Sequence, residues 1–186
     1  MNDPRKRRIV LGVTGSISAA KAQSIALALQ HRDFEVRLAM TYSATKVIGE
    51  AALRAVVHTA PFVDMWAARG DEGGETHIEW AAWADAMLIA PATASCIHDL
   101  WAGAFNSSVT LVAGTLPFTR IFFAPAMAKE MWDQPSVQRN VRELTNWGAT
   151  FLGPVLGTVA SGRQGMRLKE PRDLAEELDR LIHAPH

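Results

Sequence analysis

The chain has 186 residues, of which 48% are apolar and 20% charged, with 19 basic and 19 acidic side chains. This size and composition are typical of one soluble domain with a sizeable core. The balanced charge gives no electrostatic reason to expect nucleic acid or a membrane as partner. A single cysteine, Cys96, excludes an internal disulfide, and no apolar run approaches the roughly 20 residues that span a bilayer. We expect a cytoplasmic protein and assign no metal ligands.

Apolar runs rich in β-branched residues alternate along the chain with segments of helical periodicity. Strands are expected at residues 9–13, 34–40, 84–91, 119–125 and 148–152. Helices are expected at residues 17–31, 44–57, 94–105, 129–147 (interrupted near Pro135) and 171–183. This alternation predicts right-handed βαβ units. We therefore expect a basic N-terminal tail at residues 1–8 and one α/β domain at residues 9–186, a single doubly wound parallel sheet.

Two segments interrupt this alternation. Residues 61–75 are irregular and contain several glycines and acidic residues, so we expect a mobile surface loop there. Residues 153–167 are again rich in glycine, and no regular element is expected in them.

The ends of the first two strands carry small and hydroxylated residues. In such a sheet, ligands bind outside the carboxyl ends of the strands. Gly15 permits close backbone approach, Ser16 supplies a hydroxyl, and the helix from Ile17 presents free N–H groups to an anion; the alternative is a plain turn with Ser16 as N-cap. The second strand ends at Thr41 and Ser43, without the acidic residue that binds an adenosine ribose. A mononucleotide such as FMN therefore fits better than NAD, although Ser43 acting as a helix cap is also compatible.

Three further segments complete an ordered set of motifs. They are residues 76–85 (THIEWAAWAD), residues 90–95 (APATAS) and residues 124–132 (APAMAKEMW). Together with the turn at residues 14–17, the set resembles the homo-oligomeric flavin-containing cysteine decarboxylases over about residues 9–181. That family includes phosphopantothenoylcysteine decarboxylases of coenzyme A synthesis and epidermin-type peptidyl-cysteine decarboxylases. The resemblance implies a Rossmann-like flavoprotein that binds FMN and oxidatively decarboxylates a C-terminal cysteine.

The resemblance also implies roles for individual residues. His77 matches the histidine that acts as base near the substrate; without the resemblance, a surface histidine beside a short helix is the simpler interpretation. The residues implied for the FMN phosphate are Gly15, Ser16, Ile17, Thr41 and Ser43, those for the flavin ring are Thr93, Ala94, Ser95 and Ala126, and those for the substrate are Ala128, Met131, Ser161 and Arg163. The family further implies a homotrimer, or a dodecamer of trimers, with the flavin between subunits.

This sequence departs from the family pattern at two asparagine positions. Ser95 and Ala128 stand where the family carries asparagines that shape the flavin site and hold the substrate carboxylate. Loss of a hydrogen bond to a charged group costs about 1.5–3 kcal/mol. Efficient decarboxylation therefore needs a substitute donor, such as Lys129 or Arg163.

A third departure bears on the product. Ser161 stands where coenzyme A pathway members often carry a cysteine that returns reducing equivalents, and its loop resembles that of the epidermin-type enzymes, which stop at the enethiol. Cys96 is expected to be a small buried side chain without a redox role. Three functions remain, in this order: an oxidative decarboxylase of a peptide's C-terminal cysteine, phosphopantothenoylcysteine decarboxylase, and a flavin-binding protein that has lost the activity. His77 and Arg163 favour the first two, and the missing asparagines favour the third.

Overall fold

The computed structural model of the protein describes residues 5–66, 76–158, 162 and 164–183. Its centre is a five-stranded, all-parallel sheet in the order β2-β1-β3-β4-β6. The strands are β1 (Arg7–Val13), β2 (Phe34–Met40), β3 (Ala86–Ala92), β4 (Ile121–Pro125) and β6 (Thr150–Phe151). The expected Rossmann-like, doubly wound α/β fold is confirmed. Its strand order reverses between β1 and β3, which is where such sheets bind ligands.

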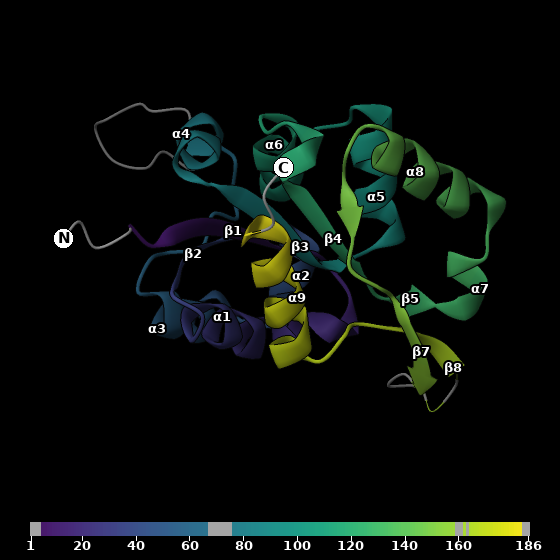
Figure 1. Cartoon of the computed structure of the whole chain (residues 1–186), viewed down its shortest axis with the longest axis horizontal. Coiled ribbons are helices and arrows are strands. Elements are labelled where there is room, and N and C mark those ends of the chain that lie inside the picture. The colour runs from purple at the N-terminus through teal and green to yellow at the C-terminus, as the bar shows by residue number, and fades with distance from the viewer. Residues whose placement is uncertain (1–4, 67–75, 159–161, 163, 184–186) are drawn as a thin grey trace.

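Helices cover both faces of this sheet (Figure 1). One face is covered by α1 (Ala22–Gln30), α3 (Glu50–Val57) and α9 (Pro171–His183), and the other by α4 (Thr76–Trp83), α5 (Ala94–Ala102), α6 (Ser108–Gly114) and α8 (Pro135–Asn146). The short elements η1 (Ile17–Lys21), α2 (Tyr42–Thr45), η2 (Phe118–Arg120) and α7 (Lys129–Trp132) connect them. Within the described ranges, no helix is long and apolar enough to cross a membrane.

A second, smaller sheet stands beside the first. β7 (Val155–Thr158) and β8 (Gln164–Arg167) form an antiparallel hairpin, and β8 also pairs with β5 (Met127–Ala128). The hairpin projects from the body of the molecule below α7 (Figure 1). The glycine-rich segment, for which no regular element is expected from the sequence, therefore folds into this hairpin.

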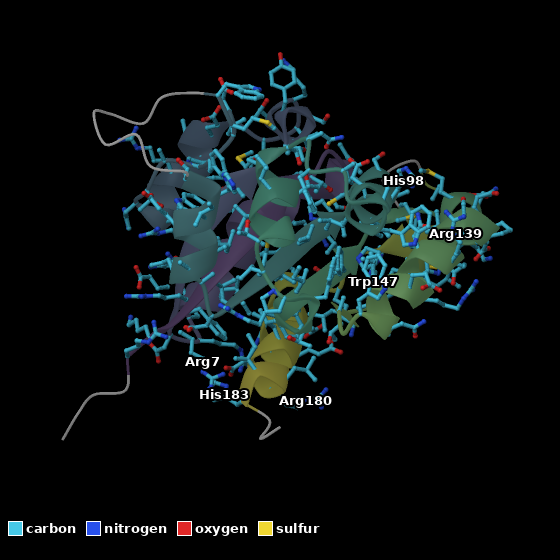
Figure 2. All side chains as sticks on the ribbon, turned by 90° about the horizontal axis from the view of Figure 1, so that it is seen from above. Arg7, His98, Arg139, Trp147, Arg180 and His183 are labelled. Atoms are coloured by element: carbon cyan, nitrogen blue, oxygen red, sulfur yellow. The ribbon has the colours of Figure 1, made fainter. Side chains whose placement is uncertain are left out.

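The first strand starts earlier than expected. Because β1 begins at Arg7, Arg7 and Arg8 belong to the sheet and not to the basic tail expected at residues 1–8. Arg7 Nη1 donates to the carbonyl oxygen of Ile182 at 2.5 Å, which joins the start of β1 to the end of α9. Figure 2 shows Arg7 beside His183 at this edge.

Part of the expected surface loop is in fact packed against the sheet. Phe62 is buried, its N–H donates to Leu38 O at 2.8 Å, and its carbonyl oxygen accepts from Met40 N–H at 2.9 Å. Phe62 thus pairs with the edge strand β2 and is not part of a free loop. The rest of the expected loop, residues 67–75, lies outside the described residues.

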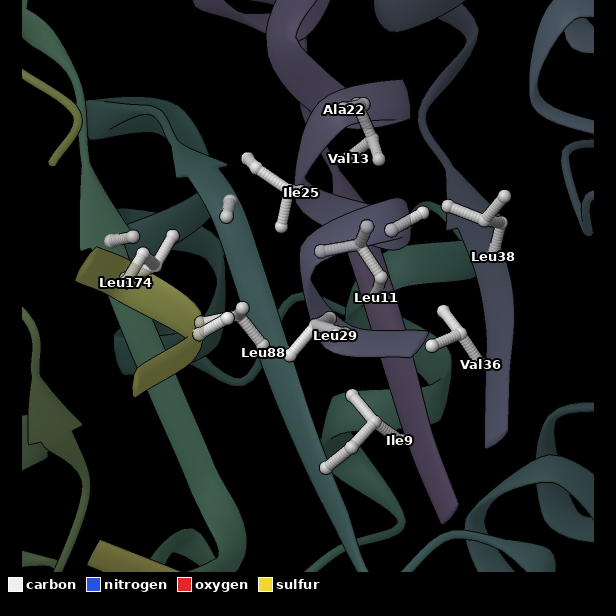
Figure 3. Close-up of a cluster of buried hydrophobic side chains, with 14 of the residues drawn as sticks. Ile9, Leu11, Val13, Ala22, Ile25, Leu29, Val36, Leu38, Leu88 and Leu174 are labelled. Carbon is white, nitrogen blue, oxygen red and sulfur yellow. The ribbon is translucent and has the colours of Figure 1, made fainter. Parts of the chain in front are cut away.

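The core consists of one cluster on each face of the sheet. Side chains alternate along β1, so that Ile9, Leu11 and Val13 face one cluster and Val10 faces the other. Figure 3 shows the first cluster, in which these side chains meet α1 and α9. Because both faces are buried, the central strands β3 and β4 read as continuous apolar runs. The polar carboxyl ends of the strands stand out from this pattern.

Candidate functional site

A buried hydroxyl joins the carboxyl ends of β1 and β3. Thr14 follows β1 and is 1% exposed. Its Oγ1 donates to Pro91 O at 2.6 Å and accepts from Thr93 N–H at 3.1 Å. Thr93 in turn caps α5, because its Oγ1 accepts from Cys96 N–H at 3.3 Å. Thr14 therefore sets the position of α5 relative to the first strand.

The ends of β1 and β2 also come into close contact. A Cβ on Gly15 would lie 2.4 Å from Ser43 Cβ and 3.3 Å from the Ser43 carbonyl carbon. Thr41 N–H donates to Val13 O at 3.0 Å, and Thr41 Oγ1 caps α2 by accepting from Ala44 N–H at 3.2 Å. The structure thus brings together three residues predicted for the phosphate side, Gly15, Thr41 and Ser43.

The capping interpretation applies to some of these hydroxyls only. Ser16 is the N-cap of η1 and accepts from Ser18 N–H at 3.3 Å. The alternative in which Ser43 caps the next helix is wrong, because Thr41 is that cap and Ser43 lies inside α2. Ser43 is exposed, and its hydroxyl makes no hydrogen bond to another residue in the described part of the chain, which leaves it available to a ligand.

A pocket of about 590 Å³ opens beside these strand ends. Its walls come from η1, from the turn between β4 and α7, and from the β7–β8 hairpin. Four predicted residues line it: Ser16, Ile17, Ala126 and Ala128. A wider groove of about 950 Å³ between α1 and α9 contains no predicted site residue. Of these two cavities, the smaller pocket is therefore the one that contains predicted site residues.

The residues predicted for the flavin ring lie at the ends of β3 and β4. Ala126 N–H donates to Ala92 O at 3.2 Å and so connects these two ends. Thr93 and Ala94 are half-buried and Ser95 is exposed, at the start of α5. The carboxyl ends of β1, β2, β3 and β4 therefore form one continuous edge.

His77 lies apart from this pocket. It is the second residue of α4, and α4 and the β7–β8 hairpin are at opposite corners of the molecule (Figure 1). Met131, on α7, is half-exposed and does not line the pocket. Ser161 and Arg163 lie outside the described residues. A single chain thus brings the residues predicted for the phosphate and for the flavin ring near Ala128, but not near His77.

Cys96 is a buried side chain, as expected. It is 4% exposed, and burial, with a smaller effect of the Asp99 carboxylate, raises the pKa of its thiol to about 12. A thiol with such a pKa is protonated at neutral pH and is a poor nucleophile.

The sequence patterns do not indicate two cationic residues that line the pocket. Lys21 ends η1 and Arg167 ends β8, and both line the pocket. They belong to opposite ends of the chain, and only the pairing of β8 with β5 brings Arg167 to the carboxyl edge of the sheet. No local pattern in the sequence predicts this pairing.

A family model described as "Flavoprotein" matches residues 1–183. The chain belongs to this flavoprotein family. It is 34% identical over 171 residues to the coenzyme A biosynthesis bifunctional protein CoaBC of Haemophilus influenzae, covering 90% of this chain and 42% of the relative. The CoaBC protein of Bacillus subtilis is 32% identical over 173 residues, with coverage of 91% and 42%. The chain thus spans less than half the length of these curated relatives.

Solved structures of the same family have the same fold. A cysteine-to-serine mutant of PPC decarboxylase, complexed with pantothenoylaminoethenethiol, superposes with a TM-score of 0.86 at 27% identity, covering 97% of this chain and 100% of that one. The FMN-dependent cysteine decarboxylase SpaF has a TM-score of 0.80 at 27% identity, with 96% of both chains covered. The family expected from the sequence is confirmed, and its members of known structure include FMN-dependent cysteine decarboxylases and an FMN binding protein, in agreement with the expected enzyme class and cofactor.

Proposed function

We propose that this protein removes the carboxylate of a C-terminal cysteine by FMN-dependent oxidation. The observation that carries the proposal is the close contact of Gly15 with Ser43, beside Ser16, which lines the 590 Å³ pocket. Because residue 15 has no side chain, the ends of β1 and β2 approach closely, which brings the backbone of this turn and the exposed hydroxyl of Ser43 together for an anion such as a phosphate. The similarity to FMN-dependent cysteine decarboxylases supports the phosphate of FMN as that anion.

The residues at the strand ends fit this cofactor. Gly15, Ser16 and Ser43 would hold the phosphate through a free hydroxyl and close backbone approach, with Thr41 holding the β2 end in place. Ile17 is 64% exposed beside the pocket and offers an apolar surface to a flat ring. Thr93, Ala94, Ser95 and Ala126 would line the other side of the ring.

When bound, FMN supplies a two-electron acceptor for the cysteine CH₂–SH group. Loss of two hydrogens from that group gives a thioaldehyde, whose carbon–sulfur double bond lies β to the carboxylate. The bond to the carboxylate carbon can then break, because its electron pair moves into an enethiolate as carbon dioxide leaves. The protein has to orient the thiol, hold the carboxylate and transfer protons.

His77 is the proposed base that takes the proton of the thiol. Because α4 lies away from the hairpin within one chain (Figure 1), the proposal requires that His77 of one subunit acts at the pocket of another. This agrees with the homotrimer, or dodecamer of trimers, that the family resemblance implies.

The carboxylate needs a donor that the side chain of Ala128 cannot provide. Lys129 is a poor substitute, since its ammonium is paired with Asp133. This hydrogen bond and the nearby negative charge also raise the pKa of Lys129. Arg163 therefore remains the better candidate for this role.

Two substrate classes are compatible with this chemistry. The serine at position 161 favours a peptide and an enethiol product, whereas the CoaBC relatives favour phosphopantothenoylcysteine. A third possibility, a flavin-binding protein without decarboxylase activity, is favoured by Ala128.

The test is to release and identify the bound flavin and to incubate the protein with phosphopantothenoylcysteine and with a peptide that ends in cysteine. The proposal predicts bound FMN and release of carbon dioxide from at least one substrate. Bound FMN without carbon dioxide from either substrate would support the third possibility. Absence of flavin would contradict the whole proposal.

A further inference from the structure

Another cavity opens at the edge of the sheet opposite the candidate site. It has a volume of about 730 Å³ and lies where β1, β3, β4 and β6 begin, beside the last turn of α9. Its apolar lining consists of Ala86, Phe122, Leu181 and Ile182. The volume is in the range of cavities that hold small organic ligands. The described lining includes none of the residues predicted for the flavin or the substrate.

Two guanidinium groups of this cavity are bonded to carbonyl oxygens only. Arg7 Nη1 donates to Ile182 O at 2.5 Å, and Figure 2 shows Arg7 at the end of α9. Arg120 Nε donates to Asp85 O at 2.7 Å, and its Nη2 donates to Ala84 O. Both arginines are half-buried, and neither pairs with a carboxylate in the described part of the chain. A guanidinium has five N–H donors, so most donors of the two groups have no acceptor among the described residues.

The third arginine of the cavity is neutralised by its neighbour. Arg5 Nη2 pairs with Asp85 Oδ1 at 2.7 Å, and Asp85 Oδ2 accepts from Arg8 N–H at 2.9 Å. Asp85 is the only acidic residue among the described lining residues, and both its carboxylate oxygens are occupied. The positive charges of Arg7 and Arg120 are therefore left without a counter-charge, in a partly desolvated place where an anion is attracted more strongly than in open water.

We propose that this cavity binds a small phosphate monoester with an apolar body, its phosphate on Arg7 and Arg120 and its body on the apolar lining. The planar guanidinium matches the oxygens of a phosphate, and a dianion neutralises two such groups where a single carboxylate would neutralise one. Thr119 and Thr150 line the same cavity, and their hydroxyls make no hydrogen bond to another described residue, so both are available to the phosphate. The site is separate from the flavin pocket and does not depend on the proposed function.

Helix capping is the alternative explanation for the two arginines. Ile182 O lies in the last turn of α9, and Ala84 O and Asp85 O directly follow α4, so both cations stand at the negative ends of helix dipoles. Capping accounts for the contacts to the carbonyl oxygens. It does not require a cavity with an apolar lining, and it predicts that the wild-type protein binds no ligand there.

The test is calorimetry with phenyl phosphate, a phosphate monoester with an aromatic body, on protein saturated with FMN. Wild-type protein should bind phenyl phosphate at least about 10-fold more tightly than benzyl alcohol, which has the ring but no charge. Arg120→Gln should weaken the binding of phenyl phosphate by about 10- to 100-fold, the range expected for charge-assisted hydrogen bonds. Arg54→Gln is the matched control, because Arg54 is exposed on α3, does not line the cavity and carries the same charge.

Arg120→Lys separates ligand binding from capping. Lysine keeps the positive charge but cannot reproduce the paired contacts of Arg120 with Ala84 O and Asp85 O. Thermal unfolding should therefore show a similar loss of stability in Arg120→Lys and Arg120→Gln, whereas Arg120→Lys should bind phenyl phosphate more tightly than Arg120→Gln. Thr150→Val, which leaves both capping contacts intact, should also weaken the binding. Equal weakening in Arg120→Lys and Arg120→Gln would assign the arginine to capping alone and overturn the proposal.

Three further results would overturn the proposed site. They are the absence of phenyl phosphate binding to the wild-type protein, equal binding of phenyl phosphate and benzyl alcohol, and unchanged binding in Arg120→Gln. Lys21→Gln tests the location, because Lys21 lines the other pocket, and this variant should bind phenyl phosphate as the wild-type protein does. Loss of binding in Lys21→Gln would place the ligand in the flavin-side pocket and contradict the proposal. Because none of these measurements uses turnover, they are independent of the outcome for decarboxylation.

Discussion

Gly15 lies so close to Ser43 that a Cβ on Gly15 would be 2.4 Å from Ser43 Cβ. In Gly15→Asp, the new Cβ would overlap Ser43, whose backbone is among the nearest atoms and cannot move aside cheaply. The two strand ends would have to separate, and a negative charge would stand beside the proposed FMN phosphate. We expect folded but colourless protein, measured as flavin absorbance per chain. Gly49→Asp is the matched control, because a Cβ there meets nothing within 4 Å and Asp is a favourable N-cap. Full FMN occupancy in Gly15→Asp would remove the basis of the phosphate assignment.

The hydroxyl of Thr14 is predicted to stabilise the site and the fold together. Thr14→Val keeps the shape but leaves Pro91 O and Thr93 N–H without their partner. The free energy of unfolding should fall by about 1–3 kcal/mol, and FMN should bind more weakly because α5 loses its link to β1. Thr115→Val removes an exposed hydroxyl bonded to Leu111 O and should change stability by less than about 0.5 kcal/mol. Denaturant unfolding measures the free energy of unfolding of both variants. If Thr14→Val and Thr115→Val lose the same amount, this role of Thr14 is contradicted.

Much of the fold follows from the sequence because both faces of the sheet are buried. The alternating segment at residues 34–40 coincides with β2, and Pro171 starts α9 as expected. Helix α6 does not follow from the sequence pattern, because Val109, Thr110 and Val112 are all buried and show no amphipathic period. The β7–β8 hairpin does not follow from the sequence pattern either, because Gly157 and Gly165 lower the strand propensity of its two segments.

Sequence reasoning could place those candidate residues that follow strands along the chain. Gly15, Ser16 and Thr41 immediately follow β1 and β2, so the rule that ligands bind at strand carboxyl ends was enough to find them. Lys21 and Arg167 could not be found in this way, because their proximity depends on the non-local pairing of β5 with β8.

His77 is predicted to affect turnover without affecting flavin content. As an acid–base group it should contribute about 10²–10⁴-fold to the rate, so His77→Asn should stay yellow and lose activity by that factor. His98→Asn is the control, since His98 is exposed on α5 beside Arg139 (Figure 2). Mixing inactive His77→Asn with a colourless Gly15→Asp variant should restore some activity if the two residues act from different subunits. Full activity of His77→Asn alone would contradict its role.

Cys96 should not react in the folded protein. Because burial raises its pKa to about 12, the thiol stays protonated at pH 8, and iodoacetamide should label the chain only after unfolding. Above pH 9 the unfolded chain loses the thiol proton while the folded chain keeps it, so rising pH should favour unfolding. Since Cys96 is the only cysteine, mass spectrometry of the intact protein reads its state directly. Rapid labelling at pH 8 without unfolding would show a reactive thiol and reopen a redox role for Cys96.

The product of a single anaerobic turnover tests the central claim most directly. With serine at position 161 and an unreactive Cys96, the chain has no thiol to return electrons to the product. The product mass should therefore be lower than the substrate mass by carbon dioxide plus two hydrogens, and the flavin absorbance should bleach and recover only when oxygen is admitted. A mass loss of carbon dioxide alone, with the flavin still oxidised, would mean that a saturated thiol was formed, and would contradict this account.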